Sequence, residues 1–195
     1  MVSALFPLAR TTLMQPRVAA DAVVQYPLSR DALWTALMLV AAVNTLVLYL
    51  LITIAPPSIA LPHYFGAPLV MFVLLAGLMV VYVHAIYWAG LAIGGQGSLN
   101  AMLSVIVWLQ LLRTLAQIGV LVLTILVPPL ALLLSVAASI WGLWILLSFI
   151  AQVLALPNLL HAAAVLVLSA VGLVLGLGIL LTLIGLAAQG VVNNV

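Results

Sequence analysis

Five long apolar runs, almost free of charge, constrain this chain more than any other feature. They lie at about 32–55, 67–93, 100–127, 129–156 and 160–188, and each has the roughly 20 residues that a helix needs to cross hydrocarbon. Only 3% of the 195 residues are charged and 69% are hydrophobic, whereas roughly a quarter of a soluble domain is charged. Because a helix satisfies its own backbone groups in lipid, the sequence predicts an all-α integral membrane protein with five transmembrane helices.

Proline, glycine and polar residues separate these runs, as expected at helix ends. The breaks are Pro56 to His63, Gly94 to Ser98, Pro128-Pro129 and Pro157-Asn158. The third break is apolar, but an unbroken helix over 100–156 would be roughly 85 Å long and would overshoot a bilayer. A tight hairpin with Pro129 in the first turn of the next helix is therefore predicted.

The sequence divides into an arm, 1–31, and a transmembrane domain, 32–195. Within the arm, 16–25 has the pattern of a short amphipathic helix on the membrane surface, and Ser29 is the expected N-cap of the first span. No later loop carries a basic residue. By the positive-inside rule, the N-terminus is expected in the cytoplasm and the C-terminus on the opposite side. This expectation rests on three interfacial basic residues: Arg10, Arg17 and Arg30.

Arg113 is the one charged residue in the middle of a predicted span, where it costs about 2.5 to 3.5 kcal/mol. Side chains three and four residues apart share a helix face, so Gln110, Thr114 and Gln117 lie on the same face as Arg113. This polar face is expected to look into protein or a wet cavity. Counting about 1.5 Å per residue, Asn44 and His84 could reach the same depth and accept hydrogen bonds from the guanidinium. The predicted midplane polar layer comprises Asn44, His84, Gln110, Arg113, Thr114 and Gln117.

None of the five spans contains a carboxylate, so Arg113 has no counter-ion within the bundle. Three interpretations remain open. Amides, carbonyls and buried water can satisfy the guanidinium structurally, or a partner subunit's carboxylate or a lipid phosphate can pair with it, or a transported anion can bind it.

The fifth run contains a small-residue pattern, Ser169, Gly172 and Gly176, that allows another helix to approach closely. Packing inside this bundle is the first interpretation, and contact with a second copy or a partner is the alternative. Trp141 and Trp144 lie near the middle of the fourth run and are expected to pack against neighbouring helices or an attached subunit.

Several function classes are disfavoured. A net charge of +2 without a basic stripe excludes a nucleic-acid partner, and the absence of cysteine removes thiolate chemistry. His84 and His161 differ in depth by about 14 Å, too much to share one haem or metal. The glycine-rich segment 94–98 lacks the lysine of a phosphate-binding loop and is predicted to be a turn. We therefore expect no catalytic residues, no cofactor and no metal site.

Short motifs in the chain resemble the Ypt-interacting-protein (Yip) family, specifically its short bacterial members. The matching segments are 8–17 (LARTTLMQPR), 27–34 (PLSRDALW), 94–98 (GGQGS) and 108–110 (WLQ). The resemblance implies a five-helix domain in the bacterial inner membrane with a cytosolic N-terminus. Eukaryotic members bind Rab-type GTPases, but the Asp-Leu-Tyr-Gly-Pro motif of their hydrophilic N-terminal region is absent here, so GTPase binding is not expected to carry over.

The leading functional hypothesis is a non-enzymatic interaction protein: an accessory or assembly subunit of a larger membrane complex, or a protein that organises lipid. Its expected partners are membrane lipids and other membrane-protein subunits. The alternative is a small anion transporter or channel that uses the midplane polar layer, although five spans do not divide into the equal repeats common in transporters.

Overall fold

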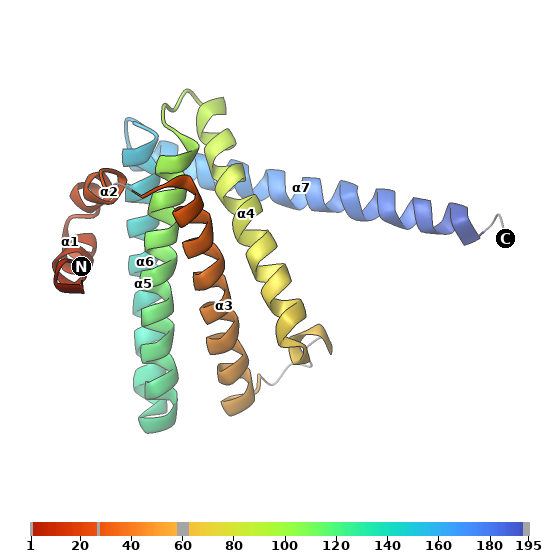
Figure 1. Ribbon diagram of the computed structural model, residues 1–195, viewed down its shortest axis with the longest axis horizontal. Helices are drawn as coiled ribbons and strands as arrows, with labels where there is room; N and C mark the ends of the chain where they lie inside the picture. The colour runs from red at the N-terminus through yellow and green to blue at the C-terminus, as the bar shows by residue number, and fades with distance from the viewer. Residues whose placement is uncertain (1, 27, 58–62, 193–195) are drawn as a thin grey trace.

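The computed structural model describes residues 2–26, 28–57 and 63–192, and over these residues the chain forms α-helices, one 3-10 turn and no strand (Figure 1). The elements are α1 (Val2–Met14), α2 (Pro16–Val24), α3 (Arg30–Ile54), η1 (His63–Gly66), α4 (Pro68–Ala92), α5 (Leu99–Leu126), α6 (Pro128–Val153) and α7 (Leu159–Val192). Helices α3 to α7 are each long and apolar enough to cross a membrane. The predicted fold class is therefore confirmed.

The long helices begin where the sequence predicts. Ser29 accepts a hydrogen bond from the backbone N–H of Ala32 at 3.2 Å, and Ser98 accepts one from Ala101 at 3.1 Å, so each hydroxyl satisfies an N–H that the first turn leaves unpaired. Helix α6 begins at Pro128 directly after α5. The predicted Pro-Pro hairpin and the Ser29 cap are both confirmed.

The end of α6 and the whole of α1 differ from expectation. Helix α6 ends at Val153 rather than near 156, because the chain turns at Ala155, whose φ is 51°; the turn is apolar, so hydropathy does not mark it. Helix α1 was not predicted, since it contains Pro7 and lacks the length of a span. In the first break, residues 58–62 lie outside the described residues, as does the C-terminal segment 193–195.

The helices pack in the spatial order α6, α5, α3, α4, α7, with α5 in contact with both α3 and α6. In Figure 1, α3 to α6 run side by side, whereas α7 crosses this group and projects away from it. Helices α1 and α2, which we call the N-terminal arm, pack on α5 and α6. We call the end of the bundle that holds Ser29 and Ser98 the cap end, and the opposite end the far end.

The packed core is concentrated toward the cap end. The largest fully buried side chains come from the beginning of α3, α5 and α7 and the later parts of α4 and α6: Leu33, Leu37, Val83, Ile86, Met102, Leu103, Val105, Ile106, Phe149, Ile150, Leu154 and Val165. At the far end, apolar side chains such as Ile54, Leu69, Val73, Ile125 and Leu132 are exposed. Lipid is the solvent that such a surface requires.

The glycine-rich turn before α5 ties the cap end together. Gly94 has a φ of 88°, a backbone conformation that glycine adopts without strain. The N–H of Gln96 donates to the carbonyl of Leu154 at 2.7 Å, and a Cβ added to Gly97 would lie 2.7 Å from the carbonyl oxygen of Val153. The glycines here permit close backbone packing against the end of α6, which agrees with the predicted turn.

Candidate functional site

Helix α5 carries most of the predicted polar layer, and its helical geometry sorts these side chains into different environments. Thr114 is buried, Gln110 and Gln117 are partly buried, and Arg113 is exposed. At about 100° per residue, Gln117 and Gln110 lie about 40° and 60° around the helix from Arg113, both on the side of Thr114, which is about 100° away from Arg113. The buried stripe is therefore centred near Thr114, and Arg113 lies at its edge.

Asn44 belongs to the buried stripe of α3, the neighbour of α5. Its side chain is 7% exposed and lies between the buried residues Val40 and Val47 on the same stripe. Counting from the Ser29 and Ser98 caps, Asn44 and Arg113 are each about 22 Å along their parallel helices. The structure thus places Asn44 and the α5 polar residues in the same stretch of the α3 and α5 pair.

We call the polar side chains Asn44 of α3 and Gln110, Thr114 and Gln117 of α5 the polar seam. Hydrogen bonding within this polar seam is incomplete. Thr114 satisfies its own hydroxyl by donating to the carbonyl of Gln110 at 2.8 Å. In contrast, Asn44 Nδ2, Gln110 Oε1 and Gln117 Oε1 are buried without a hydrogen-bond partner among the described residues. An unpaired buried polar group costs about 1 to 3 kcal/mol, so these amides mark a part of the bundle that is not optimised for its own packing.

Arg113 itself is not buried against protein, and the expectation that its face looks into protein or a wet cavity stays a prediction. The side chain is exposed and makes no hydrogen bond or ion pair with any described residue. Its charge is close enough to interact electrostatically with the phenol of Tyr82 on α4. The predicted hydrogen bonds from the guanidinium to Asn44 and His84 are not formed.

His84 also leaves the predicted layer. Its ring stacks on Trp34, with ring centroids 5.9 Å apart and an interplanar angle of 18°, and its Nδ1 donates to the carbonyl of Val80 at 2.8 Å. Trp34 lies about 15 Å from Asn44 along α3, toward the cap end. Because α4 runs antiparallel to α3, a residue late in α4 meets the beginning of α3.

The small residues of α7 do not form the predicted contact within the bundle. Ser169 is buried and donates to the carbonyl of Leu166 at 2.8 Å. Gly172 and Gly176 are exposed, and a Cβ added to either would meet nothing within 4 Å. After Ser169, α7 has moved away from α4 and α6 (Figure 1), so packing of these glycines inside the bundle is wrong and contact with another chain stays a prediction.

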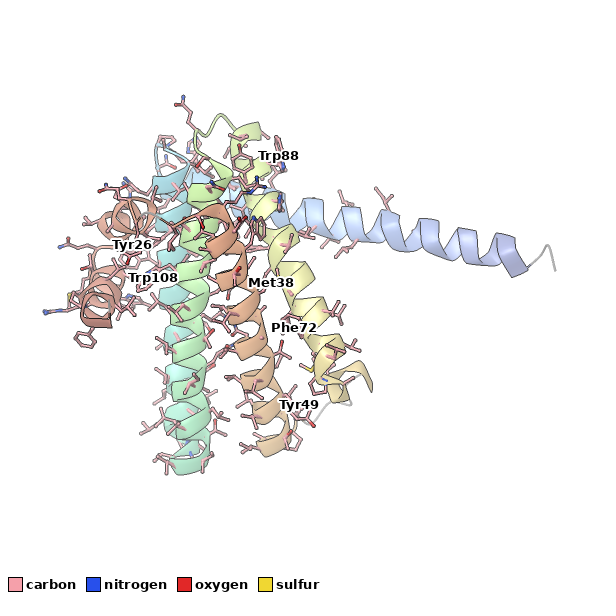
Figure 2. The ribbon with its side chains drawn as sticks, in the orientation of Figure 1. Tyr26, Met38, Tyr49, Phe72, Trp88 and Trp108 are labelled. Carbon is pink, nitrogen blue, oxygen red and sulfur yellow. The ribbon has the colours of Figure 1, made fainter. Side chains whose placement is uncertain are left out.

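The three interfacial arginines, Arg10, Arg17 and Arg30, are all exposed. Arg10 and Arg17 lie on the N-terminal arm, which two tryptophan side chains hold in place. Trp108 Nε1 donates to Thr12 Oγ1 at 3.0 Å, at the contact of the arm with α5 (Figure 2), and Trp141 Nε1 donates to the carbonyl of Leu13 at 3.1 Å. The sequence predicts packing for Trp141 but not for Trp108, and it does not predict α1, the helix that both side chains bind.

Other kinds of site find little support in the described part of the chain. No three His, Asp or Glu side chains among the described residues lie close enough together to hold a metal ion. His161 is exposed in the first turn of α7, where its Nδ1 donates to Asn158 Oδ1 at 2.8 Å. The side chain of His63 lies outside the described residues.

The chain is a multi-pass helical membrane protein. It has five helices long and apolar enough to cross a membrane, and apolar side chains are exposed at the far end of the bundle. The family model of the Yip1 domain matches residues 10–182. The chain therefore belongs to the Yip1 domain family, as its short motifs suggested. No curated protein and no solved structure matches it.

Proposed function

We propose that this protein is a non-enzymatic accessory or assembly subunit that binds another membrane protein through Arg113. The observation that carries this proposal is the exposed guanidinium in the middle of α5, which has no hydrogen bond or ion pair among the described residues. A charge left in hydrocarbon costs about 2.5 to 3.5 kcal/mol. A carboxylate on the transmembrane helix of a partner would remove that cost and form a bidentate pair.

The charges of the chain support an external counter-ion. The chain has only two acidic residues, Asp21 and Asp31. Asp21 accepts hydrogen bonds from Gln152. Asp31 lies in the first turn of α3, where a negative charge interacts favourably with the helix dipole. Arg113 is about 20 Å from either end of α5, so neither carboxylate is placed to pair with it. A carboxylate from another chain is the simplest counter-ion at this depth.

The polar seam and the exposed lateral surface support the same proposal. Gln110 and Gln117 lie beside Arg113 on α5 and carry buried carbonyl oxygens without partners. A partner helix that reaches Arg113 would contact this edge of the seam and could supply donors to the amides. Interhelical hydrogen bonds and close packing, rather than hydrophobic burial, stabilise helix association in lipid.

The distribution of basic residues supports a proposed orientation in the membrane. Arg30 begins α3 at the cap end, Arg10 and Arg17 lie on the arm, and no arginine among the described residues lies at the far end. The positive-inside rule assigns the end richer in basic residues to the cytoplasm. We place the protein in the bacterial inner membrane, with the N-terminus cytoplasmic and the C-terminus on the opposite side. Labelling of single-cysteine variants from either side of the membrane checks this orientation, because the chain has no cysteine of its own.

Isolation of the intact complex tests the function. The protein is purified from its native membrane in mild detergent, and co-purifying chains are quantified by mass spectrometry for wild type, Arg113→Gln, Arg113→Lys and Leu115→Ala. Leu115 is a matched control because it is exposed on the same helix two residues away. Loss of one partner of a desolvated charge pair costs roughly 2 to 5 kcal/mol, so Arg113→Gln should lower partner recovery by at least about tenfold, whereas Leu115→Ala should not.

The lysine variant separates charge from geometry. Lysine keeps the positive charge but not the planar fork of donors. The amount of partner recovered with Arg113→Lys is therefore expected to lie between the amounts recovered with wild type and with Arg113→Gln. A monomer without a stoichiometric partner would overturn the proposal, as would equal recovery of the partner with Arg113→Gln. If Arg113 retains a phospholipid in place of a protein, its counter-ion is a lipid phosphate and the subunit role fails.

A further inference from the structure

A second site lies at the cap end, away from Arg113, where the N-terminal arm meets α6. The arm, α6 and the first residue of α7 enclose a shallow hollow that opens to the outside of the bundle. It is lined by Gln15, Pro16, Arg17, Val18, Trp144, Ser148 and Leu159. A cation, a tryptophan and aliphatic side chains are combined in this hollow.

The positive charge of Arg17 is not neutralised by the protein. Asp21 is one helical turn further along α2 and would be its natural partner, but both Asp21 carboxylate oxygens accept hydrogen bonds from Gln152 Nε2 of α6, at 3.0 and 3.1 Å. Arg17 is exposed and pairs with no described residue. Gln152 thus holds the arm in place and leaves the guanidinium of Arg17 free at the hollow.

The depth of the hollow matches the boundary of the hydrocarbon. The residues of the hairpin between α5 and α6 are apolar and exposed, so the far ends of these helices can remain within lipid. Counted from Pro128, Trp144 lies about 24 Å and Ser148 about 30 Å along α6, and the hydrocarbon core is about 30 Å thick. Trp34 and Trp88 stand about 30 Å from the far ends of their own helices, as expected for an interfacial aromatic belt.

The outer surface of the arm is suited to the same boundary. Phe6 is 79% exposed, Met14 64% and Val18 55%, and the exposed arginines Arg10 and Arg17 are interspersed with them. Apolar side chains mixed with basic ones are typical of helices that lie in the interface of an anionic leaflet. Acyl chains are therefore expected beside the hollow, and phosphates at its mouth.

We infer that this hollow binds the headgroup phosphate of an anionic phospholipid from the leaflet at the cap end. Arg17 donates hydrogen bonds to the phosphate oxygens, while Val18 and Trp144 contact the glycerol and upper acyl region. This site is independent of the proposed partner contact, because it shares no residue with the surface around Arg113.

Lipid retention by the full-length protein tests the inference. Wild type, Arg17→Gln and Arg10→Gln are exchanged into detergent with equal amounts of phosphatidylglycerol and phosphatidylcholine, and bound lipid is counted by native mass spectrometry. Arg10 is the matched control because it is exposed on the same arm but does not line the hollow. Arg10→Gln removes only general surface charge, which is worth at most about fivefold in anionic lipid affinity per basic residue. Arg17→Gln also removes charge-assisted hydrogen bonds to the phosphate, so it should weaken phosphatidylglycerol retention by about tenfold or more.

A second measurement reports on the site in a bilayer and on folding. Val18→Cys, the sole cysteine, is labelled with an environment-sensitive fluorophore in nanodiscs, and quenching by brominated phosphatidylglycerol is compared with quenching by brominated phosphatidylcholine. Stronger quenching by the anionic lipid, lost in the Arg17→Gln background while the labelled protein stays monodisperse, supports the site.

Three outcomes overturn the inference. If Arg10→Gln and Arg17→Gln weaken phosphatidylglycerol retention equally, the lipid responds to general surface charge and not to the hollow. Equal quenching by the two lipids means that the hollow does not select an anionic headgroup. Displacement of phosphatidylglycerol by millimolar inorganic phosphate would make this a site for a free oxyanion rather than for a lipid.

Discussion

The hydrogen bond from Trp108 to Thr12 offers a direct test of how the N-terminal arm is anchored. Thr12 is fully buried and accepts from Trp108 Nε1 at 3.0 Å. Thr12→Val keeps the shape of the side chain but removes the acceptor, which leaves the buried indole N–H unpaired at a cost of about 1 to 3 kcal/mol. That free energy corresponds to a shift of about 5- to 150-fold toward the undocked arm.

Cysteine accessibility measures this shift. Ala19 is on α2 of the arm and is fully buried in the core, so Ala19→Cys, as the only cysteine in the chain, reacts with a membrane-impermeant maleimide when the arm undocks. Thr12→Val should raise the labelling rate by the same factor. Thr11→Val is the control, because the Thr11 hydroxyl bonds only to the carbonyl of Pro7 in its own helix; it should change the rate by no more than about twofold. Equal rates for the two valine variants would refute the anchoring role of the Trp108 bond.

Two further substitutions test the packing of the bundle by thermal unfolding in detergent. Gly97→Ala places a Cβ 2.7 Å from a backbone carbonyl oxygen and should destabilise the protein by about 1 to 3 kcal/mol. Gly77→Ala is the control and should not destabilise it, because a Cβ at Gly77 meets nothing within 4 Å. Equal losses of stability in the two variants would refute the tight packing of the turn. Asn44→Leu removes an unpaired buried amide and should raise the free energy of unfolding by about 1 kcal/mol, whereas Asn100→Leu at an exposed position should not. A lower stability of Asn44→Leu would mean that the amide is satisfied in the membrane.

The positions of the long helices were predictable because apolar run length and turn residues are local properties of the sequence. Ser29, Ser98 and the Pro128 hairpin mark helix ends through their own hydrogen bonding or ring geometry. Helix α1 was missed because it is short and contains Pro7, and its stability comes from contacts with distant tryptophans. Local patterns carry no information about such contacts.

The candidate site was predictable in composition but not in orientation. Helical spacing predicts that Gln110, Arg113 and Gln117 are neighbours on α5, yet it cannot decide which edge of the group faces α3. Thr114 is at the centre of the buried stripe, and Arg113 lies exposed at its edge. The sequence does not predict the surroundings of His84, because a depth counted along straight helices takes no account of the stacking of its ring on Trp34.

The concentration of the core at the cap end has a consequence for how the protein responds to its membrane. Local stability follows the density of buried contacts, so the half nearer Ser29 and Ser98 should resist exchange, while the far half depends on the lateral pressure of the surrounding acyl chains. Changes in the thickness or tension of the far leaflet can then alter the spacing of α3 to α6 at the far end without disturbing the arm. Such a molecule is rigid toward one leaflet and compliant toward the other.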